Sequence, residues 1–194
     1  MDAYARAREL IDAAHDADPN RTREGTAAER IYADHLEKWV ARLVPEAPPL
    51  LRLAARCQHL ERWQVPRSTY PEGKVGYLTW RRALYKIQSE RARTLLLDAG
   101  VPPAEADDVA TWVSKTGLKT NPGTQALEDA AVLVFLEKEI HAFAAQHAEY
   151  PREKFVDIIR KSWRKLSPTG QAAATALALP PDVAALVHDA TADS

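Results

Sequence analysis

The chain has 194 residues, of which 46% are hydrophobic and 27% are charged, and its formal net charge is −1. This composition is that of a globular protein with a full core, so we expect a single domain over 1–194. The near-neutral charge makes a nucleic-acid partner unlikely, and no apolar run approaches a membrane span. The only cysteine, Cys57, excludes an internal disulfide, and the charged N-terminus lacks the apolar segment of a signal peptide. We therefore expect a cytoplasmic location.

Apolar residues at helical spacing and the positions of Pro and Gly predict an all-α fold. The predicted helices, in chain order, are 2–17, 26–44, 48–63, 77–98, 102–115, 124–147, one that begins at Pro151, one at Ser167 and a short one after Pro180. The second starts with a capping box, Thr26 to Glu29. Residues 64–76 contain two prolines and two glycines and predict a long loop. The helix 124–147 is apolar nearly all round in its middle, so we expect it to be the most buried element.

Charge is unevenly distributed along the chain. Residues 61–93 contain eight basic side chains against three acidic ones, the balance reverses over 98–149, and a second basic stretch follows Pro151. Such stretches are either solvated helix faces or a local anion site, and the sequence leaves both readings open.

Three polar segments interrupt this helical framework: His35, Gln58-His59 and Glu128-Asp129. Histidine and carboxylate side chains on helices that pack together can form a metal site. Each segment also has a simpler interpretation. His35 lies in the apolar stripe of its helix, where a core histidine needs only one partner. His59 lies off the stripe, where it could pair with a neighbour at the rim.

The carboxylates Glu128 and Asp129 precede a buried apolar run and therefore need a partner. The simpler interpretation is a structural salt bridge or hydrogen bond to Arg56 or Arg62. Taken together, the three segments favour a common site over three separate structural roles.

The order of these segments resembles the HD superfamily of metal-dependent phosphohydrolases over about residues 26–140, with a helical extension beyond. RIYADHLEKWVARL is similar to the first ligand helix, LRLAARCQHLERW to the second and QALEDAAVLVFLE to the last. Gln58 replaces the usual His and His59 the usual Asp, which leaves open which of them supplies the ligand. Ser89 and Lys115 stand where two-metal members have histidines, so the resemblance implies one metal.

The whole chain also resembles an uncharacterised all-helical family of bacterial and fungal proteins, sometimes labelled glutamyl-tRNA synthetase. The stretches that carry this resemblance are QHLERWQVPRSTYPEGKVGYLTWRRAL, QALEDAAVLVFLEKE and IIRKSWRKLSPTG. The synthetase label finds no support in these residues, because the chain has neither a nucleotide-binding glycine loop nor an alternating α/β pattern.

The HD resemblance implies a hydrolase that acts on a phosphorylated small molecule or nucleotide. One divalent metal ion would be held by His35, His59 and Asp129 and would activate water. Glu61 or Glu128 would take the proton. The residues expected to bind the anionic substrate are Arg56, Arg62, Arg67, Lys74 and Lys115. The alternative is a non-catalytic module on a degenerate HD scaffold, which binds a phosphorylated ligand or a protein.

Overall fold

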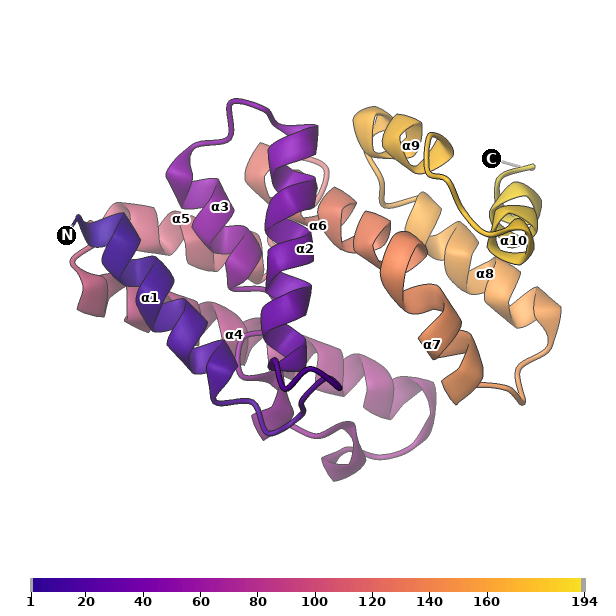
Figure 1. Ribbon diagram of the computed structural model, residues 1–194, viewed down its shortest axis with the longest axis horizontal. Helices are drawn as coiled ribbons and strands as arrows, with labels where there is room; N and C mark the ends of the chain where they lie inside the picture. The colour runs from indigo at the N-terminus through magenta and orange to yellow at the C-terminus, as the bar shows by residue number, and fades with distance from the viewer. Residues whose placement is uncertain (1, 193–194) are drawn as a thin grey trace.

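A computed structural model describes residues 2–192 of the chain (Figure 1). These residues form helices and turns without a β-strand, apart from one isolated bridge between Arg21 and Ala27. The predicted all-α fold class is therefore confirmed. Among the described residues, no helix combines the length and the apolar character that crossing a membrane requires.

The α-helices follow one another along the chain, with the longest connection between α3 and α4. They are α1 (Ala3–Asp16), α2 (Ala28–Leu43), α3 (Pro49–Arg56), α4 (Gly73–Ala99), α5 (Pro103–Val113), α6 (Pro122–Val134), α7 (Ile140–Gln146), α8 (Arg152–Trp163), α9 (Pro168–Thr175) and α10 (Pro181–Thr191). Two 3-10 turns, Arg62–Gln64 and Arg67–Thr69, lie between α3 and α4. A π-helical turn, Phe135–Glu139, joins α6 to α7.

The helices pack in two connected groups. In the first, α4 packs against α1 and α5, while α2 packs against α3 and α6. In the second, α8 packs against α10, and α9 contacts α6. Figure 1 shows α7 to α10 (orange to yellow) on the side of α2 that is away from α1, α3 and α5. One apolar core joins both groups, since it contains residues from Ala7 of α1 to Ala190 of α10.

The helix expected over 124–147 is interrupted by the π-helical turn, and only its first part, α6, is deeply buried; in the turn and α7 only Leu136 and Ile140 are buried. Ten of the thirteen residues of α6 are buried, a larger share than in any other helix described. Asn121 caps it, accepting hydrogen bonds from the backbone N–H groups of Gly123 and Thr124. Because two of the buried residues are the carboxylates Glu128 and Asp129, this helix carries charge into the core and each charge needs a partner there.

The structure differs from the sequence-based expectation between α3 and α4. Helix α3 ends at Arg56, well before the predicted end near Trp63, and α4 begins at Gly73 inside the predicted loop. The early end of α3 is fixed by His59 and Glu61, whose φ angles of 59° and 52° are left-handed and break a helix. The predicted capping box is also wrong: the N-cap of α2 is Ala27, and no side chain caps it.

The loop before α4 folds back onto the helix. A Cβ atom at Gly76 would lie 1.8 Å from the carbonyl oxygen of Pro71, so only glycine fits there. Arg67 donates hydrogen bonds to the carbonyls of Tyr70 (2.9 Å) and Pro71 (2.8 Å). The loop is thereby fixed against the start of α4, and Arg67 is engaged with its backbone.

Candidate functional site

Asp129, the predicted metal ligand on α6, holds the start of α9 instead. It accepts hydrogen bonds from Gln125 Nε2 (2.8 Å) and from the backbone N–H (2.9 Å) and hydroxyl of Ser167. Ser167 in turn caps α9 by accepting from the N–H of Gly170 (3.1 Å). A Cβ at Gly170 would lie 2.7 Å from Asp129 Cγ, so α9 can approach this closely only because it has glycine there. Neither Arg56 nor Arg62, the partners considered from sequence, contacts Asp129.

His35 lies elsewhere on the surface of α2, half-buried. Burial and then the positive charge of Lys138 lower the pKa of its imidazole. The described residues contain no group of three or more His, Cys, Asp or Glu side chains placed to hold a metal ion. The structure therefore does not bring His35, His59 and Asp129 together, contrary to the expectation from sequence.

The immediate surroundings of His59 also do not fit a metal. Its Nδ1 lies 3.1 Å from Glu29 Oε2, and Arg62 Nη1 donates to its Nε2 at 2.8 Å. A guanidinium within hydrogen-bond distance of both the imidazole and any bound cation would repel that cation. With Asp129 committed to α9, the predicted donor set is incomplete. Metal binding by this protein stays a prediction, and these three residues do not fit it.

Arg56, expected to bind an anionic substrate, is instead the centre of a buried ion-pair network. Its side chain is fully buried. It donates to Asp12, to Asp34 Oδ1 (2.7 Å) and to Glu37 Oε2 (2.9 Å). Burial alone would lower the pKa of Arg56, but the hydrogen bonds to these carboxylates raise it overall. This guanidinium is saturated by carboxylates of its own chain, so the expectation is wrong for Arg56.

Three further predicted residues have other partners or stand apart. Glu61, a candidate proton acceptor, forms a two-pronged ion pair with Arg91, with contacts of 3.0 to 3.1 Å. Arg67 is bonded to loop carbonyls. Lys74 is exposed on the first turn of α4. The structure assigns none of these three to a common site with His59.

The structure does assemble a different set of residues around His59. We call it the polar centre, and it comprises Glu29, Tyr32, His59, Arg62, Arg81, Lys115, Glu128, Glu139 and Lys165. The ring of His59 stacks on Tyr32, with ring centroids 4.0 Å apart and planes within 5°. Glu29 accepts from Nδ1–H of His59, which leaves Nε2 as the acceptor for Arg62. Burial and then the charge of Arg62 lower the pKa of His59 to about 4, so this imidazole is neutral at pH 7.

Two arginines of the polar centre form no direct ion pair, although the charge of Arg62 acts on Glu29 and Glu139. Arg62 lies over the ring of Trp80, with its Cζ 4.9 Å from the ring centroid. Arg81 lies between two tyrosines, donating to the hydroxyls of Tyr77 (3.1 Å) and Tyr85. Both arginines are half-buried, and no carboxylate of the described residues forms an ion pair with either. The charge of Arg81 acts on both His59 and Lys115, so it lies near both.

Glu128 and two lysines form the other side of the polar centre. Glu128 Oε2 lies 3.1 Å from Lys115 Nζ, and its Oε1 lies 3.2 Å from Lys165 Nζ. Burial raises the pKa of Glu128, but the two lysines outweigh burial and lower it to about 2. The ammonium of Lys115 is inaccessible to solvent, and its contact with Glu128 lacks hydrogen-bond geometry. Lys115 therefore has donors to spare, and burial lowers the pKa of its ammonium although Glu128 opposes this.

The backbone is strained where it enters the polar centre. His59 and Lys115, at φ 59° and 62°, are two of the four non-glycine residues with positive φ that the structure describes, and Glu61 is a third. Glu139 comes from the π-helical turn, and burial and then Glu29 raise its pKa. Left-handed non-glycine residues and π-turns cost free energy and cluster at functional sites. Their convergence here marks the polar centre as the candidate site.

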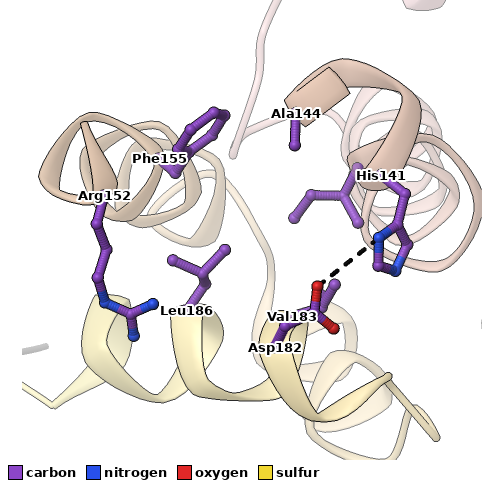
Figure 2. Close-up of a pocket in the computed structure, with 8 residues that line it drawn as sticks. His141, Ala144, Arg152, Phe155, Asp182, Val183 and Leu186 are labelled. Carbon is purple, nitrogen blue, oxygen red and sulfur yellow. Dashed lines mark ion pairs between the residues drawn. The ribbon is translucent and has the colours of Figure 1, made fainter. Parts of the chain in front are cut away.

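A hollowed surface lies elsewhere on the molecule. Figure 2 shows a groove between α7, α8 and α10, lined by apolar side chains such as Phe155 and Leu186. Its volume is about 320 Å³. Its two polar ends are already paired: His141 lies 3.8 Å from Asp182, and Arg152 lies 2.7 Å from Asp189. Since no unpaired polar group lines this groove, it offers little to orient a polar ligand.

Sequence reasoning missed five members of the polar centre: Glu29, Tyr32, Arg81, Glu139 and Lys165. A signal existed for three of them. Glu29 and Tyr32 are three residues apart on one helix face, and Arg81 is four residues from both Tyr77 and Tyr85. An arginine with an aromatic residue four positions before and after it on a helix is expected to have its guanidinium fixed in place by the two rings. Nothing in the sequence marks the π-helical turn that presents Glu139.

The fold and site together define an all-helical protein with a cationic centre built by the helices α2, α4 and α6 and by the turns that follow α3, α5, α6 and α8. The family model described as a domain of unknown function, DUF4202, matches residues 5–187, so the chain belongs to this family. No curated protein matches the chain, and no solved structure matches it. The resemblance to the HD superfamily stays a prediction.

Proposed function

We propose that this protein binds a phosphorylated small molecule at the polar centre. The observation that carries the proposal is the pair Arg62 and Arg81, which are half-buried and form no direct ion pair with a carboxylate of the described residues. Partial burial of a charge without a direct ion pair costs free energy. An anionic ligand would remove this cost. Other buried cations of the chain, such as Arg56, have their counter-ions built in.

The charges of the polar centre suit a phosphate group. Four cations, Arg62, Arg81, Lys115 and Lys165, stand against the ionised Glu29 and Glu128, whose pKa values are lowered. This leaves a surplus of two positive charges, or one if Glu139 is also ionised. A phosphate monoester carries nearly two negative charges at pH 7. The planar guanidinium groups can bind its oxygens in pairs, and the aromatic rings hold them in place for this.

A second candidate function, hydrolysis of the bound phosphoester, is favoured by the contact between Glu29 and His59. A carboxylate that accepts from Nδ1–H fixes the tautomer in which Nε2 can take a proton. If a ligand phosphate attracts Arg62 away from Nε2, His59 becomes free to deprotonate an attacking water. The new O–P bond forms as the bond to the leaving oxygen breaks, and the leaving oxygen takes a proton from solvent or from the Glu139 carboxyl.

Isothermal titration calorimetry with inorganic phosphate and with sugar phosphates, at low salt, tests the proposed function. Arg62→Gln and Arg81→Gln should each weaken binding about tenfold or more, because each removes a charge-assisted hydrogen bond worth about 1.5–3 kcal/mol. The matched control is Arg82→Gln, since Arg82 is exposed and adjacent on α4.

Two outcomes would contradict the proposed function: no binding of any phosphate compound, or an equal loss in the Arg82 control. Release of phosphate from a panel of phosphoesters, lost in His59→Gln while binding remains, would support hydrolysis. Binding without turnover across the panel would favour the non-catalytic module.

A further inference from the structure

A second surface, independent of the polar centre, lies on the outer face of α4. All four large apolar side chains that the structure describes as exposed are on this helix: Val75 (79% exposed), Tyr77 (41%), Leu78 (42%) and Ile87 (42%). The inner face of the same segment is a narrow buried stripe that includes Trp80 and Leu84. Figure 1 shows the start of α4 at the periphery of the molecule, next to the loop that follows α3.

Two of these residues lie in a continuous stripe with charged neighbours. The stripe consists of Glu72, Val75, Leu78, Thr79, Arg82 and Lys86, all exposed. The spacing of three and four residues puts them on one side of the helix. Its acidic end, Glu72, and its basic part, Arg82, form no ion pair with any described residue. The stripe thus has an apolar middle with one unpaired charge of each sign on either side.

We propose that this stripe is the interface of a homodimer in which two copies of α4 pack antiparallel across a two-fold axis. Such an axis between Val75 and Leu78 puts Val75 of each copy against Leu78 of the other. Glu72 and Arg82 are ten residues apart, about 15 Å along a helix. Because they flank the apolar middle almost symmetrically, Glu72 of each copy then faces Arg82 of the other, so the dimer contains two such ion pairs.

The charge pattern selects a second copy over other occupants. A two-fold interface requires that residue i contacts j while j contacts i, and a stripe with an acid at one end and a base at the other meets this requirement. An anionic membrane surface would be repelled by Glu72, and an acidic protein partner would leave Glu72 opposed to like charge. The interface uses neither Arg62 nor Lys115, so the proposal of a dimer is independent of the proposal of ligand binding.

Sedimentation velocity over a wide range of protein concentration tests this proposal on the full chain. The wild type should show a concentration-dependent monomer–dimer equilibrium. Leu78→Glu and Arg82→Glu should each raise the dimer dissociation constant about tenfold or more. The charge-swapped double variant Glu72→Arg/Arg82→Glu should restore the dimer, because the two ion pairs re-form with reversed signs.

Ile87→Glu is the matched control, since Ile87 is equally exposed on α4 but lies off the stripe, and it should leave the dimer unchanged. All the substituted side chains are exposed, so circular dichroism should show an unchanged helical content. A wild type that stays monomeric at every concentration would overturn the proposal. The proposal would also be overturned if this monomer bound anionic vesicles or an acidic protein through the same face. Failure of the charge-swapped double variant to form the dimer would also overturn the proposal.

Discussion

Replacing Arg56 by Met should destabilise the protein more than replacing any surface charge. Arg56 is fully buried and holds Asp12, Asp34 and Glu37 within hydrogen-bond distance of one guanidinium. Removing a buried partner leaves uncompensated charge and costs about 3–5 kcal/mol. Because the Asp34 side chain is 44% exposed and can rehydrate, we expect the lower end, about 3 kcal/mol.

Urea unfolding followed by circular dichroism measures this effect. With a slope of about 2 kcal/mol per molar urea, the midpoint should fall by about 1.5 M. The control Arg52→Met changes an exposed arginine on the same helix and should stay within about 0.5 kcal/mol. A loss below about 1 kcal/mol for Arg56→Met would refute the view that this residue is a structural ion-pair centre.

The pH dependence of the Arg56 effect follows from Glu37. Burial raises the pKa of Glu37, but hydrogen bonds from Arg8 and Arg56 outweigh burial and lower it overall. A carboxyl with a lowered folded-state pKa stabilises the protein above its unfolded pKa, and this contribution disappears as pH falls through the folded value. The difference between wild type and Arg56→Met should therefore shrink under acidic conditions.

Three further predictions concern the fold and the polar centre. Asp129→Ala should cost about 2–3 kcal/mol by leaving the donors of Gln125 and Ser167 unpaired, and hydrogen exchange should speed up in α9 with little change in phosphate binding. Proton NMR of His59 should give a pKa near 4; since this lies below its unfolded value, wild-type stability should rise between about pH 4 and 6.5, and His59→Gln should lose that rise. Gly76→Ala should lower the melting temperature by several degrees, because a Cβ there collides with the Pro71 carbonyl, whereas Gly25→Ala meets no atom and should suffer only from its backbone angle.

Much of the fold could be predicted because helical periodicity and the residues that start or stop helices are local features of the sequence. Proline at the first turn marks the starts of α3, α5, α9 and α10. The burial of α6 was predicted correctly from its run of apolar residues. The turn after α3 was missed because LRLAARCQHLERW keeps good helix formers throughout, and the left-handed residues His59 and Glu61 are held by tertiary contacts with Glu29 and Arg91.

The site was predicted only in part for a related reason. The polar centre does contain four of the predicted residues, namely His59, Arg62, Lys115 and Glu128. The role of Asp129, however, depends on the direction in which its side chain points. Adjacent residues on a helix point about 100° apart. Glu128 therefore faces the lysines while Asp129 faces the start of α9, a helix that sequence reasoning could not place beside α6. In the same way, nothing local shows that Arg56 points toward α1 and α2 and away from a ligand.

The central claim is that Arg62 and Arg81 are counter-charges for a bound phosphate. The most direct test is calorimetric titration of the wild type, Arg81→Gln and Arg82→Gln with the same phosphate compound at low salt. The account predicts binding to the wild type and to Arg82→Gln, and a loss of about tenfold or more in Arg81→Gln. Equal affinities in all three proteins, or no binding by the folded wild type, would contradict it.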